Sequence, residues 1–222
     1  FLDPDPDPDL IERAAAVLGN AENPGIFIGG GIWGAEEHLL TLAEELQAPV
    51  FTSPHGNGAI DSRHYLSQNL MCAKEIWNKI DVVLSVGTRY QSPASWGQQE
   101  EKQLIRVDID PEQSLQIAKP DIHIVSTAVA SLRALSERVQ RHNRSRESKK
   151  ETLVQLKKKI MDRFNSVEPQ YSYNSVIRDE LPEDGIACFG VTQLGFAAWF
   201  GFPTYQPRTL IHPGYQGTLG YA

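Results

Sequence analysis

The chain has 222 residues, of which 41% are hydrophobic and 22% charged, the composition of a folded globular protein rather than a disordered one. Its formal net charge of −7 argues against nucleic acid as a partner, because backbone binding needs clustered Lys and Arg. No apolar run approaches the ~18 residues of a membrane helix. The two cysteines, Cys72 and Cys188, cannot form a disulfide framework. We therefore expect a cytoplasmic protein with no membrane and no nucleic-acid partner.

Acid and proline alternate through residues 3–9, which predicts a stiff, solvated linker over residues 1–9. The chain starts at Phe1 rather than at Met and shows no signal-peptide pattern. We expect this linker to follow a preceding domain, and a regulatory acidic tail is the alternative. Asp9 is the expected N-cap of the first helix.

Apolar runs alternate with amphipathic stretches over residues 10–140. The runs predict strands at 26–28, 49–52, 81–87, 103–111 and 122–125, and the helical periodicity predicts helices at 10–18, 36–46, 73–77 and 128–139. Such alternation indicates right-handed crossovers between parallel strands. The expected fold class is therefore α/β, an open, mostly parallel sheet with helices on both faces in a Rossmann-like central domain.

The composition changes between residues 138 and 163, where ten basic residues stand against three acidic ones. A basic run can bind polyanions, but a solvated helix face between domains is the commoner role. Leu153, Leu156 and Ile160 form one apolar stripe, which predicts a helix lying on another part of the protein. We expect a basic helical connector over residues 141–168.

A truncated second α/β unit is predicted over residues 169–222. Its sequence indicates a helix at 172–180, with Val176 and Ile177 as the apolar members, a strand at 186–190 and a helix at 194–199. Cys188 stands in the predicted strand among apolar residues. We therefore expect it to pack rather than to catalyse.

A glycine turn and an acidic strand end are the first candidates for binding chemistry. Gly29, Gly30 and Gly31 follow the first predicted strand, where backbone N–H groups could approach a phosphate. The spacing differs from the dinucleotide fingerprint, so a tight turn without ligand is an equal alternative. Asp110 would hold a ribose hydroxyl or cap the helix that follows Pro111. Gly30, Gly31 and Asp110 are thus candidate nucleotide-binding residues.

Other catalytic patterns are missing from the sequence. The six histidines lack metal-ligand spacing, and neither the nucleophile elbow nor the P-loop pattern occurs. We assign no metal ligand and no catalytic residue to this chain.

Two later segments suit a ligand. Residues 190–193 follow a predicted strand and offer a hydroxyl and an amide for phosphate oxygens. Residues 217–220 offer backbone amides and carbonyls around one bulky apolar residue, Leu219. These segments are plausible halves of one site, and their chemistry does not name the ligand.

Segments of residues 9–139 resemble the central domain of thiamine-diphosphate-dependent enzymes of the acetolactate synthase, pyruvate decarboxylase and benzaldehyde lyase superfamily. The matching segments are 23–31, 48–52, 57–60, 81–89 and 107–111, in the family's order and at about its spacing. The resemblance implies thiamine diphosphate with Mg²⁺ as cofactors of the complete enzyme, a 2-oxo acid or aldehyde substrate, and a homodimer or homotetramer.

From Pro169 the chain resembles the start of that family's diphosphate-binding domain. Thr192 and Gln193 match positions that contact the cofactor diphosphate. In the family, the carbonyl at the position of Gly217 accepts from the aminopyrimidine, and the bulky residue at the position of Leu219 holds the cofactor bent. The resemblance therefore implies that these residues bind thiamine diphosphate, whose bent form deprotonates its own thiazolium carbon.

The resemblance also implies parts that this chain lacks. The family's activating glutamate would precede Phe1, and its metal-binding motif would follow Ala222. We expect a segment of an acetolactate synthase-like carboligase or decarboxylase that is inactive alone. Residues 67–71 stand where flavin-binding members have a His-Gly loop, so FAD is not expected. The alternatives are a stand-alone module that binds FAD or ADP and a non-catalytic dimerisation scaffold.

Overall fold

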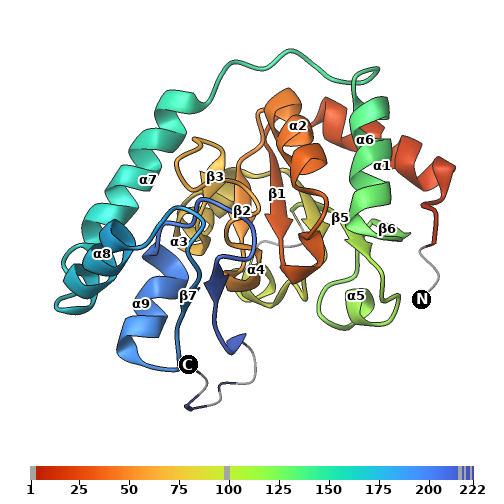
Figure 1. The fold of residues 1–222 in the computed structure, drawn as a ribbon. Helices are drawn as coiled ribbons and strands as arrows, with labels where there is room; N and C mark the ends of the chain where they lie inside the picture. Colours follow the sequence, from red (N-terminus) through yellow and green to blue (C-terminus); the bar gives the residue numbers. More distant parts are fainter. Residues whose placement is uncertain (1–3, 98–100, 215–216, 218, 221) are drawn as a thin grey trace.

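A computed structural model of the chain describes residues 4–97, 101–214, 217, 219, 220 and 222. Its centre is a six-stranded, fully parallel sheet in the order β3-β2-β1-β4-β5-β6. The strands are β1 (Pro24–Ile28), β2 (Val50–Thr52), β3 (Ser67–Gln68), β4 (Val82–Val86), β5 (Gln103–Asp108) and β6 (Ile122–Val125). Figure 1 shows the sheet in the middle of the molecule.

Helices lie on both faces of the sheet, which confirms the predicted fold class. The helices α1 (Pro8–Asn20), α2 (Glu36–Leu46) and α6 (Ala128–Val139) pack together on one face. The other face is covered by α3 (Leu70–Ile76), by α4 (Gln91–Ala94) and by the turn η3 (Trp77–Lys79). Shorter elements are η1 (Gly30–Ile32), η2 (Pro54–Gly56) and α5 (Gln113–Gln116). No described helix has the length and apolarity needed to cross a bilayer.

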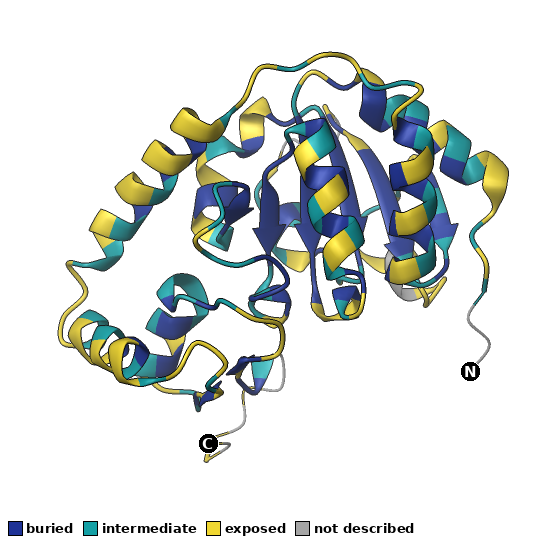
Figure 2. Cartoon of the chain, turned by 45° about the horizontal axis from the view of Figure 1, so that its top comes forward, coloured by how far each residue is buried: buried dark blue, intermediate teal, exposed yellow. Residues whose placement is uncertain are grey.

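The core divides into two clusters because successive strand residues point to opposite faces. Ile26 and Ile28 join the cluster under α1, α2 and α6, whereas Phe27 between them joins the aromatic cluster of the other face. All five residues of β1 are buried. A strand covered on both faces must be apolar throughout, and Figure 2 shows the central strands in dark blue.

The first helix begins earlier than predicted. Asp7, not Asp9, is its N-cap, and its carboxylate accepts from the N–H groups of Asp9 (2.8 Å) and Leu10 (3.3 Å). The reason is Pro8, whose fixed φ and missing N–H suit the first helical position.

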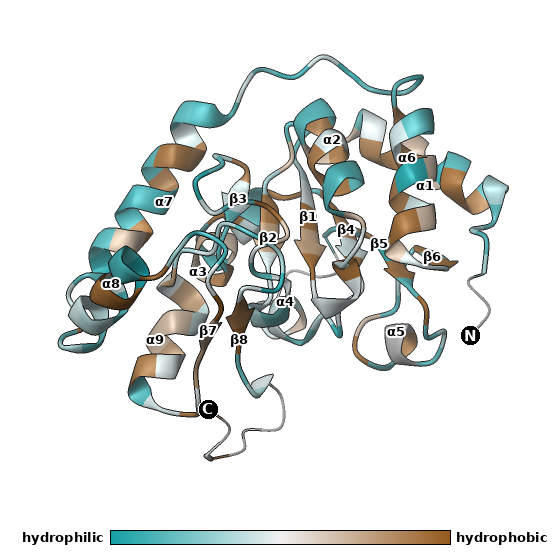
Figure 3. Ribbon diagram, in the orientation of Figure 1, coloured by the Kyte–Doolittle hydropathy of each residue, from teal (hydrophilic) through white to brown (hydrophobic). Residues whose placement is uncertain are grey.

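The helix α7 (Lys150–Phe164) lies beside the sheet domain, as its apolar stripe predicted. Leu153, Leu156 and Ile160 are buried in the same cluster as the sheet residues. Figure 3 shows these turns of α7 as brown bands between teal ones. On its polar side, Lys159 and Arg163 form ion pairs with Glu75 of α3. The domain boundaries at residues 140 and 168 remain predictions.

The second unit is small and has its own core. It contains α8 (Gln170–Glu180), β7 (Ala187–Cys188), α9 (Gln193–Gly201) and β8 (Leu210–Ile211), and the two strands are parallel. Ala187 and Phe189 point into the core, so Cys188 between them points outward and is exposed. The prediction that Cys188 packs inside was therefore wrong.

The packed face of α8 is more polar than its sequence suggested. Asn174 and Arg178 are buried, whereas Val176 is 60% exposed. The Arg178 guanidinium donates to the carbonyls of Leu181 and Pro182, both at 2.6 Å, so hydrogen bonds compensate part of the cost of its burial.

The second unit contacts the sheet domain where residues 57–69 meet residues 199–206, a contact that we call the seam. Side-chain amides cross it to backbone carbonyls, from Asn57 to Trp199 (3.3 Å) and from Asn69 to Phe200 (2.8 Å). Gly58 has a φ of +90°, and a Cβ there would lie 2.4 Å from a backbone oxygen of residue 206. The two backbones are therefore in close contact.

Arg146 ties the segment before α7 to the sheet domain. Its guanidinium donates to the carbonyls of Leu18 (3.0 Å), Gly19 (2.9 Å) and Ala21 (2.7 Å), at the C-terminal end of α1. The last carbonyls of a helix have no partners within the helix, so this side chain supplies them.

We predict that Arg146→Ala lowers the free energy of unfolding by about 2–3 kcal/mol, because it removes several charge-assisted hydrogen bonds. Arg144→Ala is the control, since Arg144 is exposed and its side chain makes only long contacts, to the Asn20 carbonyl at 3.5 Å and to the Glu22 carboxylate at 3.7 Å. It should change stability by no more than about 0.5 kcal/mol. Urea unfolding measures the free energy of unfolding of both variants, and equal losses would contradict the role assigned to Arg146.

Candidate functional sites at the carboxyl ends of the strands

The strand order places a ligand crevice between β1 and β4. The chain runs outward from β1 through β2 to β3 on one side and from β4 to β6 on the other. In open α/β sheets, ligands bind outside the carboxyl ends of the strands at such a switch point. The turn after β1 contains Gly29, Gly30 and Gly31, and the turn after β4 begins with Gly87.

These two turns cross each other at backbone contact. Gly31 N donates to the Gly87 carbonyl at 2.9 Å, and a Cβ on Gly31 would lie 2.7 Å from Gly87 Cα. A Cβ on Gly29 would lie 2.5 Å from the same carbonyl oxygen, and Gly87 has a φ of +54°. Sterics alone therefore require glycine at all three positions. A Cβ on Gly30 would only touch His55 Cβ at 3.4 Å, so Gly30 has no such requirement.

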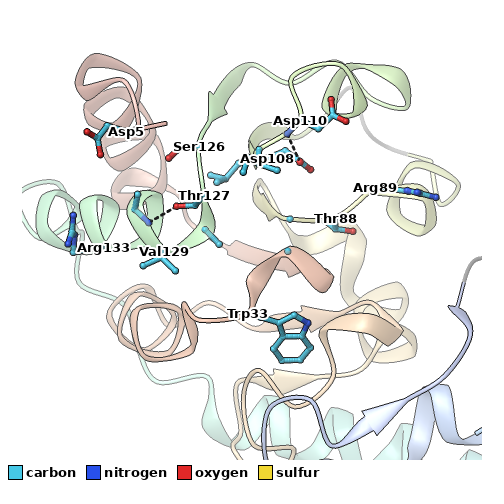
Figure 4. Close-up of a pocket in the computed structure, with 16 residues that line it drawn as sticks. Asp5, Trp33, Thr88, Arg89, Asp108, Asp110, Ser126, Thr127, Val129 and Arg133 are labelled. Carbon is cyan, nitrogen blue, oxygen red and sulfur yellow. Dashed lines mark hydrogen bonds between the residues drawn. The ribbon is translucent and has the colours of Figure 1, made fainter. Parts of the chain in front are cut away.

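A cavity of about 770 Å³ opens beside this crossing, and we call it the crevice cavity (Figure 4). It is lined by Gly31, residues 87–89, residues 107–110 and the start of α6. Its volume suits a medium-sized ligand. Thr127 caps α6 by accepting from Ala130 N at 3.2 Å. The positive end of this helix therefore faces the cavity.

Asp110 lies at the rim of the crevice cavity, as one prediction required. Its N–H donates to Asp108 Oδ1 (3.1 Å), and its own Oδ1 accepts from Glu112 N (2.9 Å). The helix α5 starts at Gln113 with Glu112 as N-cap, so Asp110 closes the preceding turn instead of capping the helix. Its exposed carboxylate also lines the cavity.

A buried arginine under the cavity floor was missed from the sequence. Arg106 of β5 is 1% exposed and donates to the Thr88 carbonyl at 2.7 Å. Its guanidinium lies 5.8 Å from the ring centre of Tyr90, a residue with a φ of +60°. Burial lowers the pKa of Arg106 and raises that of the Tyr90 hydroxyl. The sign of this buried arginine in the sequence is a single charged residue among the apolar residues of segment 104–107.

A second cavity of about 430 Å³ continues from the crossing toward the second unit. It shares Gly31 and residues 87–89 with the crevice cavity and adds His55, Trp199 and Gly214. The rings of His55 and His212 lie 4.5 Å apart, and burial lowers the pKa of both imidazoles. This contact between the two units was missed, because the histidines were considered only as metal ligands.

Thr192 and Gln193 lie together at the exposed start of α9. Thr192 is the N-cap, and its Oγ1 accepts from Gly195 N at 3.0 Å. The Oε1 of Gln193 accepts from Gln170 Nε2 at 2.7 Å. The turn 190–193 therefore presents a hydroxyl, an amide and a helix N-terminus to solvent.

The glycine loop, residues 217–220, is followed by Ala222, which lies close to this turn. A Cβ on Gly190 would lie 4.0 Å from atoms of Ala222, the last residue of the chain. Gly217 has a φ of +59°, and Leu219 is 81% exposed. Residues 215, 216, 218 and 221 lie outside the described residues. The structure thus places Ala222 near Gly190, and the combination of the two segments into one site remains a prediction.

Within the described ranges, no group of three or more His, Cys, Asp or Glu residues is arranged to hold a metal ion. Of the predicted nucleotide-binding residues, Gly31 and Asp110 line the crevice cavity, whereas Gly30 lines the second cavity. Their roles remain predictions.

Open parallel α/β sheets with a crevice at the switch point are the fold class in which nucleotides and cofactors commonly bind at that crevice. The family model described as thiamine pyrophosphate enzyme, central domain, matches residues 11–135. The chain therefore belongs to the thiamine pyrophosphate enzyme family, which confirms the predicted resemblance.

Known proteins extend this match over the rest of the chain. A probable 2-ketoarginine decarboxylase of Pseudomonas aeruginosa is 30% identical over 223 aligned residues, covering 96% of this chain and 39% of the relative. The acetolactate synthase large subunit of Corynebacterium glutamicum is 26% identical, covering 96% and 37%. The X-ray structure of a Mycobacterium smegmatis protein assigned to the thiamin diphosphate-dependent enzymes has a TM-score of 0.74 at 18% identity, covering 98% and 43%. The chain spans about two fifths of the length of these relatives.

We predict that Gly31→Ala lowers the free energy of unfolding by about 2 kcal/mol or more, because the new methyl group overlaps the turn after β4. Gly30→Ala is the matched control and should stay within about 1 kcal/mol of the parent. Urea unfolding at constant m-value measures both. Similar losses in the two variants would contradict the steric role of the crossing.

Proposed function

We propose that this chain is the central domain and the start of the diphosphate-binding domain of a thiamine-diphosphate-dependent enzyme that decarboxylates or ligates 2-oxo acids. The match of the central-domain family model is the observation on which this proposal rests. The relatives support it, since one is named for decarboxylation of 2-ketoarginine and another for acetolactate synthesis. We propose that the complete enzyme is a cytoplasmic homodimer or homotetramer.

The start of α9 suits the cofactor diphosphate. Thr192 is exposed, and its hydroxyl can donate to a phosphate oxygen while its oxygen still accepts from Gly195 N. Gln193 uses only its Oε1 toward Gln170, so its NH₂ group can donate in the same direction. The helix N-terminus adds favourable interaction with a negative charge.

The glycine loop suits the other end of the cofactor. An apolar side chain as exposed as Leu219 gains free energy when a ring covers it. The carbonyl of Gly217, in open surroundings, is available to accept a hydrogen bond from an amino group. We propose that Leu219 holds the cofactor bent and that Gly217 orients its aminopyrimidine.

Bound thiamine diphosphate supplies a carbon nucleophile and an electron sink for decarboxylation. The residues of this chain bind and orient the cofactor, and none acts on the reacting atoms. On the family resemblance, we propose that Mg²⁺ and the activating glutamate are held by other segments of the complete enzyme. The chain alone is therefore proposed to be inactive.

We predict that the complete protein containing this segment releases CO₂ from a 2-oxo acid in a reaction that requires thiamine diphosphate and Mg²⁺. In that protein, Thr192→Val should raise the Kd of thiamine diphosphate about tenfold, because a hydrogen bond to a charged group is lost. Thr192→Ser retains the hydroxyl and should restore binding to within about threefold. Calorimetric titration measures these constants.

The 222-residue chain provides the negative control for this experiment. It should show no binding heat with thiamine diphosphate and Mg²⁺, because it contains only part of the site. Micromolar binding by the chain alone would contradict the proposed division of the site, and CO₂ release without the cofactor would contradict the function itself.

The crevice cavity favours a second function, binding of an adenine nucleotide as ADP. Its walls combine an acidic rim at Asp110, suited to ribose hydroxyls, with the N-terminus of α6, suited to phosphate. FAD is not proposed. Residues 67–71 form β3 and the start of α3, and Asn69 bonds across the seam to Phe200.

We predict that ADP binds this chain and that Val129→Asp lowers the affinity at least about tenfold, since the new carboxylate repels phosphate. Val129 lines the crevice cavity in the first turn of α6, where an acid does not destabilise the helix. Val154→Asp is the control, because Val154 lies on the exposed side of α7 and does not line the crevice cavity. Calorimetry with ADP and separately with FAD measures the effect, and equal losses in both variants would contradict this site.

A further inference from the structure

The seam encloses a cavity that the proposed functions do not use. It has a volume of about 290 Å³ and shares no lining residue with either cavity at the glycine crossing. Its walls are residues 52–69 of the sheet domain, residues 157–161 of α7 and residues 200–205 of the second unit. We call it the seam cavity. Its volume is at the lower limit of ligand sites.

One wall carries a lysine without a carboxylate partner among the described residues. Lys157 Nζ donates to the carbonyls of Ser62 (2.7 Å) and His64 (2.9 Å), which leaves one N–H of the ammonium group. Asp61 lies nearby, but its two oxygens already accept from Arg63. Burial lowers the pKa of Lys157, which reflects the cost of holding this charge away from water.

The same wall contains a buried amide oxygen without a donor. Gln68 is 1% exposed, and its Nε2 donates to the carbonyls of Tyr65 (2.7 Å) and Leu153 (3.3 Å). These bonds fix the amide orientation, so Oε1 must face elsewhere, and it is buried without a partner. Such a group costs about 1–3 kcal/mol unless something donates to it. The hydroxyl of Ser62 is also buried and unpaired.

These groups lie within reach of one small molecule. Gln68 bonds to the carbonyl of Leu153, which is one helical turn before Lys157 on α7, and a turn advances ~5.4 Å. Ser62 is in direct contact with Lys157 through its carbonyl. A cation, a hydroxyl and an amide are therefore contributed to one cavity by three neighbouring lining residues.

The rest of the seam cavity is largely apolar. Ile60 and Phe202 are buried and line it, together with Met161 and Phe200. An occupant would therefore have a polar end with a negative charge and a donor, and an apolar remainder.

We propose that the seam cavity binds a small carboxylic acid that has a hydrogen-bond donor on the carbon next to the carboxylate and a short apolar side chain. This is the chemistry of an apolar α-amino acid or α-hydroxy acid. The carboxylate pairs with Lys157 and Ser62, the neighbouring donor bonds to Gln68 Oε1, and the side chain packs against Phe202. The ligand thereby bridges the two units across the seam.

Calorimetric titration of the full 222-residue chain with three matched acids tests this proposal. L-leucine has an amino donor, 2-hydroxy-4-methylpentanoate has a hydroxyl donor, and 4-methylpentanoate has neither. We expect binding of leucine, of the hydroxy acid or of both, and binding at least about tenfold weaker for 4-methylpentanoate, which leaves Gln68 Oε1 unpaired. Whichever of leucine and the hydroxy acid binds with the lower Kd identifies the donor as an amino group or a hydroxyl group.

Two variants locate the site. Lys157→Met should weaken binding at least about tenfold, whereas Lys158→Met on the exposed side of the same helix should not change it. Lys157→Met also loses two native hydrogen bonds, so Ser62→Ala serves as the second variant, since its hydroxyl has no partner to lose. It should weaken binding about threefold or more.

Three results would overturn the proposal. The first is no binding of leucine or the hydroxy acid with a Kd of about 10 mM or below. The second is equal binding of 4-methylpentanoate, which would exclude the role of Gln68. The third is binding that neither Ser62→Ala nor Lys157→Met weakens more than Lys158→Met does.

Discussion

The backbone crossing of two glycine turns, one after β1 and one after β4, is the constraint on which the ligand-binding side of this domain depends. Gly31 and Gly87 touch so closely that neither can have a side chain. The crossing holds the carboxyl ends of the two central strands in register, and the crevice cavity and the second cavity open on either side of it. Arg106 supports the same turn from below by bonding to Thr88. The same pair of turns therefore requires glycine for steric reasons and lines both cavities.

The second unit depends on a different kind of contact. Its own core is small, and it joins the sheet domain through α7 and through the seam. Hydrogen bonds at the seam run from Asn57 and Asn69 to backbone carbonyls, and nearby the rings of His55 and His212 pack together, where burial lowers the pKa of both imidazoles. The contact between the units thus combines paired amides with buried polar atoms that have no partner among the described residues, at Ser62 and Gln68 and also at Trp199 and His212.

Elements with strong periodicity were predicted accurately. The helices α2 and α6 begin and end at the predicted residues, because their apolar stripes pack on one sheet face. The sequence did not identify the backbone carbonyls that accept from the buried Arg106 and Arg178, since a carbonyl has no sequence signature. The candidate roles of residues 190–193 came from the family resemblance. The seam cavity was not predicted from the sequence, because it brings together Gln68 and Lys157, which are 89 positions apart.

The use of backbone carbonyls as acceptors at the seam affects which substitutions the protein tolerates. The carbonyls that receive the amides of Asn57 and Asn69 belong to Trp199 and Phe200, and every amino acid has such a carbonyl. Substitution of Trp199 or Phe200 would therefore leave these two acceptors in place, whereas substitution of either asparagine would remove a donor. These two hydrogen bonds thus depend on side chains of the sheet domain alone, whereas the ion pair of Arg63 with Glu183 depends on side chains of both units.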